Sequence, residues 1–147
     1  MIKQFVLIVV TCSFNFSNAQ DITQNQVPSL IVNLFSAEFQ KGTDIEWEMD
    51  GTLYTVDFET AWYLNHTAWY NEEGNIVKHM EDIQVSKLPK AVKQKIKSGF
   101  SSYIIDDIER ITENEKIVYR FELNSMIHQD WDVVVDSKGK IVSKIVD

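Results

Sequence analysis

The sequence predicts an α+β protein made of two similar halves, each a helix followed by an antiparallel sheet. The first observation is a repeated phrase: Tyr70–Met80 and Val135–Ile145 both read as strand, glycine turn and strand, at an offset of 65 residues. The second is a set of alternating apolar residues that precedes each phrase at the same offset. The third is a helical spacing of apolar residues that opens each half. Together these patterns predict a duplicated chain.

Each half begins with apolar residues four apart behind an early proline. Residues four apart share one face of a helix, and a proline in the first turn removes no internal hydrogen bond. We therefore expect two helices, both packed on one face of the sheet. The matching residues, at an offset of 61, are Val27-Pro28, Ile31, Phe35 and Phe39 with Leu88-Pro89, Val92, Ile96 and Phe100.

About four strands are expected after each helix. Alternate apolar positions are those of one buried strand face. The offsets of 61, 63 and 65 differ by two, so the changes in length fall in turns and leave the strand faces in register. The matching strand residues are Tyr54, Val56 and Phe58 with Tyr119, Phe121 and Leu123, and Ile45 with Ile108.

Glycine turns mark the hairpins. Asn71 to Gly74 and Asp136 to Gly139 place a side-chain acceptor first and a glycine where the chain takes a positive φ. Gly51 and Asn114 indicate two earlier hairpins.

Residues 1–19 are predicted to be a signal peptide that is cleaved after Ala19, because a lysine, an apolar stretch and small residues follow in that order. The stretch is shorter than the roughly 20 residues that cross a bilayer, so we expect no transmembrane segment. The only cysteine, Cys12, lies in this leader, which leaves no disulfide in the mature chain. Lipidation of Cys12 is the alternative, which the bulky Thr11 disfavours.

Residues 20–147 are expected to form one domain with a single hydrophobic core, made of repeats at about 27–85 and 88–147. The net charge is −8, and −9 without the leader, which holds one lysine and no acid. Nucleic acid is therefore excluded as a partner, since its binding draws on lysine and arginine. A basic protein surface or a cationic ligand suits this charge better.

The pattern resembles the PepSY-like family, which is related to β-lactamase-inhibitor-like proteins and occurs in secreted and periplasmic bacterial proteins. The resemblance covers nearly all of residues 27–147, but Phe39-Gln40 and Phe100-Ser101 stand where relatives often have Phe-Pro at the helix end. It implies a helix laid across an antiparallel sheet, twice, and a non-enzymatic binding or inhibitory role in the cell envelope. The residues that carry it are Val27-Pro28, Ile31, Phe35, Phe39, Ile45, Trp47, Tyr54, Val56, Phe58, Asn71, Gly74, Leu88-Pro89, Tyr119, Phe121, Asp136 and Gly139.

The predicted binding surface is the sheet face that the helices leave uncovered. Outward strand parity places tyrosine, tryptophan, arginine and histidine there, and such residues are enriched at protein interfaces. Plain sheet packing is the alternative, because aromatic residues are also good strand formers. The predicted anchors for an envelope protein or peptide are Tyr63, Trp69, Arg120 and His128.

A small-ligand or metal-handling protein is the alternative function, using His79, Glu81 and Asp82. The acidic strand of Asp44, Glu46, Glu48 and Asp50 could hold a cation, but a solvated outer face is the favoured interpretation. His66 fits a core position with a hydrogen-bond partner.

We expect neither an enzyme nor a cofactor, because the sequence carries no phosphate loop, nucleophile elbow or paired-cysteine metal motif. His128 with Asp130 and Asp132 could form an acid–base set, but an exposed sheet face seldom shifts pKa values. The lysines of the second helix, Lys90, Lys93 and Lys97, share a face that we expect to be solvated rather than bound to a membrane.

Overall fold

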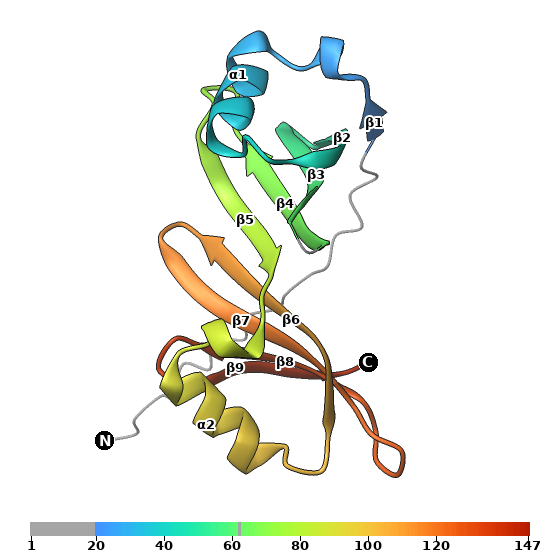
Figure 1. The fold of residues 1–147 in the computed structure, drawn as a ribbon, viewed down its shortest axis with the longest axis vertical. Coiled ribbons are helices and arrows are strands. Elements are labelled where there is room, and N and C mark those ends of the chain that lie inside the picture. The colour runs from blue at the N-terminus through green and yellow to red at the C-terminus, as the bar shows by residue number, and fades with distance from the viewer. Residues whose placement is uncertain (1–19, 62) are drawn as a thin grey trace, which may run out of the picture.

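The computed structural model describes residues 20–61 and 63–147, and its nine strands form one antiparallel sheet in which every strand pairs with its neighbours along the chain (Figure 1). The predicted leader and its cleavage site lie outside the described residues. No helix in the described part is long and apolar enough to cross a bilayer. The elements are β1 (Gln20–Ile22), η1 (Gln24–Gln26), α1 (Ser29–Glu38), β2 (Thr43–Asp50), β3 (Leu53–Thr60), β4 (Leu64–Tyr70), β5 (Ile76–Asp82), η2 (Val85–Lys87), α2 (Lys90–Gly99), β6 (Ile104–Glu113), β7 (Lys116–Asn124), β8 (Trp131–Asp136) and β9 (Ile141–Val146).

The predicted α+β class is confirmed, and the element order repeats as the offsets require. α1 with β2 to β5 corresponds to α2 with β6 to β9. A short strand, β1, adds to the outer edge of β2 and was not expected, because three residues carry too little alternation to be recognised. The two halves join edge to edge, since β5 pairs with β6 over residues 78–82 and 109–113.

Strand register relates the two helix-covered surfaces. Residues directly opposite each other in neighbouring strands lie on the same face of a sheet. Across the five strands β4 to β8, the residues in one such row are His66, Glu81, Arg110, Tyr119 and Val135. This row passes from the surface under α1 to the surface under α2 without changing face, so both helices lie on one side of the sheet.

The buried apolar residues form two clusters, so the expectation of a single core is wrong. The first cluster holds α1 residues such as Ile31 and Phe35 together with Val56 and Phe58 of β3. The second holds Val92 and Ile96 of α2 with strand residues of β6, β7 and β8. The sheet is continuous, but α1 and α2 cover opposite ends of it (Figure 1). Between them, Glu81 of β5 stands opposite Arg110 of β6 on the same face.

The two glycine turns take the predicted form. Gly74 and Gly139 have φ of +83° and +84°, and each donates its N–H to the carbonyl of the Asn71 or Asp136 that opens the turn. The side chain of Asp136 also accepts hydrogen bonds from the N–H groups of Lys138 and Lys140, at 2.9 Å each. Local side-chain acceptors and glycine thus set the hairpins.

Candidate functional site

The open face, defined as the sheet face opposite α1 and α2, carries an apolar strip where the two halves join. Met80 of β5 stands opposite Ile111 of β6, and Ile111 stands opposite Val118 of β7. All three side chains are half-buried by their strand neighbours alone. No pattern in the sequence indicates this strip, because it forms only where β5 pairs with β6.

Trp69 lies on the open face next to this strip. It stands opposite Thr55 of β3 and Lys78 of β5, and the Lys78 ammonium lies 4.5 Å from the centre of the indole ring. Thr55 is buried beside it, with a hydroxyl that has no hydrogen-bond partner. Trp69 is therefore a half-buried aromatic residue that is braced by a cation and still partly open to solvent.

Arg120 lies on the same face, on the other side of the strip. Its guanidinium donates to Asp132 at 2.8 Å, Glu109 at 3.1 Å and Glu122 at 3.4 Å. Burial acts to lower the pKa of Arg120, but the hydrogen bonds to Asp132 and Glu109 outweigh it and raise that pKa. The guanidinium is thus held in place by three carboxylates, and Asp132 keeps one buried oxygen without a partner.

Tyr63 and His128 lie away from this pair. Tyr63 is 86% exposed at the β3–β4 turn and has a φ of +55°. The strand expected through His128 is wrong, because β8 begins at Trp131 and the N–H of His128 instead donates to the Ser125 hydroxyl in a loop. The imidazole of His128 lies 6.1 Å from the ring of Tyr103. Of the four predicted anchors, only Trp69 and Arg120 therefore lie on strands of the open face.

A histidine pair occupies the opposite, helix-covered face between the two apolar clusters. His66 Nδ1 and His79 Nε2 are 3.2 Å apart, and Thr60 Oγ1 lies 2.8 Å from His66 Nε2. The ring centres are 5.4 Å apart with planes 10° from parallel, so the rings lie end to end with the two nitrogens between them. One ring donates its N–H to the other, as neutral imidazoles can. The expected core position of His66 is confirmed.

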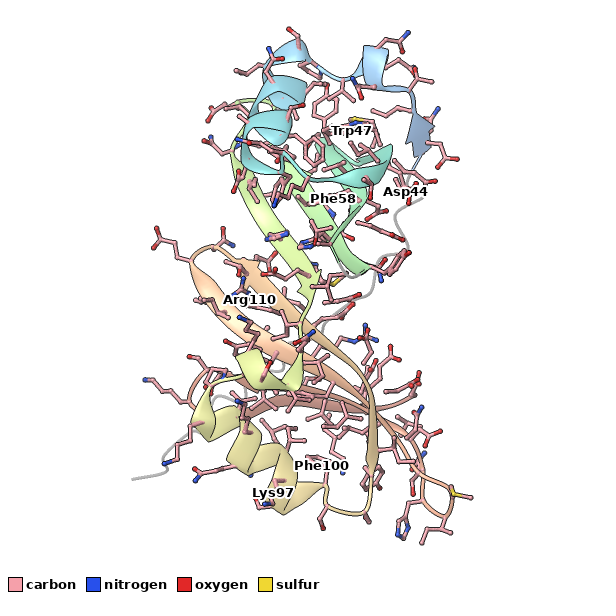
Figure 2. The ribbon with its side chains drawn as sticks, viewed as in Figure 1. Asp44, Trp47, Phe58, Lys97, Phe100 and Arg110 are labelled. Atoms are coloured by element: carbon pink, nitrogen blue, oxygen red, sulfur yellow. The ribbon has the colours of Figure 1, made fainter. Side chains whose placement is uncertain are left out.

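Charged neighbours surround this pair at the junction of the halves. Glu81 lies 3.9 Å from His66 Nδ1 and accepts a hydrogen bond from the guanidinium of Arg110, which comes from the second half (Figure 2). Burial lowers the pKa of both histidines, while Glu81 acts against that shift. The matching positions in the second half are Trp131 and Lys144, whose ammonium lies 3.7 Å from the indole centre. In the sequence, His66 shares strand parity with Ala68 and Tyr70, both of which are buried, and this parity is the signal for its helix-covered position.

The residues of the predicted metal set do not converge. Asp82 lies on the open face, where it accepts hydrogen bonds from Asn65, whereas His79 and Glu81 point to the helix-covered face. The rings of His66 and His79 are nearly parallel and bring two nitrogens within 3.2 Å of each other, which is a hydrogen-bond contact between them. The arrangement suits a shared proton instead.

The acidic strand is also less regular than expected. The register of β2 shifts between Thr43 and Glu46, and Asp44 has a φ of +49°. Burial, followed by repulsion from Asp57 and other carboxylates, raises the pKa of Glu48. Elsewhere, carboxylate oxygens of Asp82, Asp107 and Glu109 approach within 4.8 Å of one another, but Arg120 already pairs with Glu109.

Comparison with known proteins places this fold. The family model described as "Putative beta-lactamase-inhibitor-like, PepSY-like" matches residues 15–78 and again residues 53–143. No curated protein matches the chain.

Several solved structures share the fold at low identity. A DUF2874 family protein from Bacteroides uniformis has a TM-score of 0.69 and 13% identity, covering 82% of this chain and 89% of that one. A structure described as "putative periplasmic proteins" from Bacteroides eggerthii has a TM-score of 0.70 and 14% identity, covering 82% of this chain and 88% of that one. A BLIP-like protein from Bacteroides fragilis has a TM-score of 0.65 and 15% identity, with coverages of 81% and 85%.

These likenesses concern the fold alone, whereas the family model matches most of the sequence. It matches in two segments that overlap over residues 53–78, and a repeated match suggests a duplicated chain. The chain therefore belongs to the β-lactamase-inhibitor-like, PepSY-like family.

Proposed function

We propose that this protein is a non-catalytic binding module of the periplasm that holds a protein or peptide on its open face and inhibits it. The observation that carries the proposal is the half-buried strip of Met80, Ile111 and Val118, flanked by Trp69 and Arg120 on a face that no helix covers. Apolar, aromatic and arginine side chains gathered on one uncovered surface have the composition that is enriched at protein interfaces.

Similarity to a BLIP-like protein and to one described as periplasmic supports both the partner class and the compartment, as an analogy. Tyr63 at the end of the face could extend the contact, whereas His128 lies on a separate loop. Arg120 would act through shape and fixed charge, because its donors are already occupied by carboxylates.

The test is capture of a partner from periplasmic extract by immobilised protein, followed by assay of the captured protein's activity with and without the module. Trp69→Ala and Met80→Ala are each expected to weaken capture about tenfold or more, as loss of an anchor does. Tyr63→Ala with Trp69→Ala should abolish it.

A matched control is Met126→Ala, which removes the same type of side chain from a loop position that is 94% exposed. It should leave capture unchanged. Equal capture by wild type and Trp69→Ala, or a large drop in melting temperature for Trp69→Ala, would show that this surface serves packing only. A partner that is captured but keeps its full activity would remove the inhibitory role.

A further inference from the structure

A groove runs beside α2 on the helix-covered side of the molecule. It encloses about 440 Å³ between η2, the last turns of α2 and the start of β6. Its floor consists of Leu88, Ile96 and Phe100, which are almost fully buried, and Tyr103 lies at its end. Volumes of this size are typical of sites for small molecules, about 300–1,000 Å³.

Positive charge collects around this groove in an otherwise acidic chain. Residues 83–105 contain five lysines and no acid, although the whole chain has a net charge of −8. Lys93 and Lys97 line the groove one helical turn apart, and Figure 2 shows Lys97 of α2 near Phe100, which follows the helix. Among residues 20–61 and 63–147, the basic partners in ion pairs are His66, Arg110 and Arg120. The lysines around the groove therefore have no carboxylate partner there.

The first half provides an internal comparison. α1 occupies the same place over its own strands and contains no lysine; Val32 and Ser36 stand where α2 has Lys93 and Lys97. Covering the sheet therefore does not require these charges. Helical spacing predicts that the lysines face solvent away from the apolar residues, but Lys93 and Lys97 line the same groove as Ile96 and Phe100.

We propose that this groove binds a single-chain anionic amphiphile, with its tail over Leu88, Ile96 and Phe100 and its carboxylate or phosphate head beside Lys93 and Lys97. Lys93 already donates to the Ser86 carbonyl at 2.9 Å, which holds its ammonium at the mouth of the groove. The apolar floor is recessed, so it cannot insert into a bilayer; an apolar chain must enter the groove instead. The site is independent of the open face.

The test uses dodecanoate, titrated into the protein below its micellar concentration and followed by calorimetry and by amide chemical shifts. We expect saturable binding of one molecule, with shifts at Leu88, Ile96 and Phe100. Dodecanol should bind more weakly. Lys93→Gln combined with Lys97→Gln should raise the Kd about tenfold or more, since each removes a charge-assisted contact.

Two further variants keep the result interpretable. Lys95→Gln removes the same charge from the same helix at a position that does not line the groove, and it should leave the Kd unchanged. Val85→Asp places a charge at the groove wall on a side chain that is 50% exposed, so it should fold and lose binding. Equal effects of Lys95→Gln and the paired lysine variants, shifts that cluster on the open face, or binding only to vesicles of phosphatidylglycerol would each overturn the proposal.

Discussion

A Cβ atom added to Gly139 would lie 2.8 Å from the carbonyl oxygen of Ala91, so the β8–β9 turn is in close contact with the backbone of α2. The matching turn in the first half meets α1 differently: a Cβ on Gly74 would lie 2.5 Å from Leu34 Cδ1, the end of a side chain. The side chain of Leu30, which corresponds to Ala91 at the helix offset of 61, also lies within 4 Å of the Cβ added to Gly74.

This difference predicts unequal costs for the same substitution. Both glycines have a positive φ, so Gly74→Ala and Gly139→Ala should each lose about 1 kcal/mol of stability. Gly139→Ala should lower stability further than Gly74→Ala, because the helix backbone at Ala91 cannot move aside as the side chain of Leu34 can. Urea unfolding of both variants measures the difference; equal losses would mean that α2 shifts easily.

Replacement of Glu115 in the β6–β7 turn by glycine should stabilise the protein. Asn114 and Glu115 both have a positive φ, at 48° and 64°, which is the conformation of a type I′ turn that favours Asn-Gly. Glu115→Gly is therefore expected to raise the free energy of unfolding by about 0.5–1 kcal/mol. Glu115→Ala, which keeps the backbone strain, is the control and should show no such gain.

The histidine pair should make stability depend on pH in a defined window. The folded-state pKa values of His66 and His79 lie below 6.5, so the unfolded chain binds more protons once the pH falls through that value. Their contribution is complete above pH 6.5 and declines as the pH falls towards the lowered folded pKa. Glu81, Asp82 and Arg110 are the charged groups that influence the pair.

The measurement is the free energy of unfolding of wild type and His79→Gln at several pH values between 7.5 and 5. The wild type should lose more stability over this range than the variant. Other titrating groups, including Glu48 and Glu122 with their raised pKa, are common to both proteins and cancel in the difference. Parallel curves would show that the pair does not titrate in this range.

Removal of Arg120 should expose the repulsion among its three carboxylates. Arg120→Gln is expected to lower stability at pH 7 by about 1–3 kcal/mol, the range for hydrogen bonds to charged groups. The loss should shrink below about pH 4, where free carboxylates begin to take up protons. Arg110→Gln is the matched control, because Arg110 is more exposed and pairs only with Glu81, so its loss should be smaller.

The predictable part of the fold came from local chemistry and from comparison of the two halves. Helix spacing, proline at each helix start and the acceptor-to-glycine turns depend on neighbours within a few residues, and each has the expected form in the structure. The equivalence of Tyr54–Phe58 with Tyr119–Leu123 located β3 and β7 in the same way.

The missed features depend on contacts between the halves or on very short segments. The strip of Met80, Ile111 and Val118 requires the β5–β6 pairing, which no pattern within one half reveals. His128 was assigned to a strand because its parity fitted, whereas Ser125 and Asp130 side chains bind backbone N–H groups there and stabilise a loop. The two clusters arise because β5 and β6 place Glu81 and Arg110 between them.

β1 pairs with the outer edge of β2 in the same way that β5 pairs with the equivalent edge of β6. Ile22 lies opposite Trp47, and Glu81 lies opposite Arg110, the residue that matches Trp47 at an offset of 63. β9 corresponds to β5 in the second half, and its outer edge pairs with no other strand in the described part of the chain. If β1 were removed, β9 of one molecule could add to β2 of the next by the same pairing that joins the two halves, and a head-to-tail contact of this kind need never close.

We therefore expect that β1 keeps one molecule from adding to the next. A variant that lacks Gln20–Ile22 is expected to form oligomers whose size increases with concentration in analytical ultracentrifugation. Adding Ile145→Lys, a charge on the opposing edge, should reverse this growth. A truncated protein that stays monomeric at high concentration would show that the polymerising edge is blocked by something other than β1.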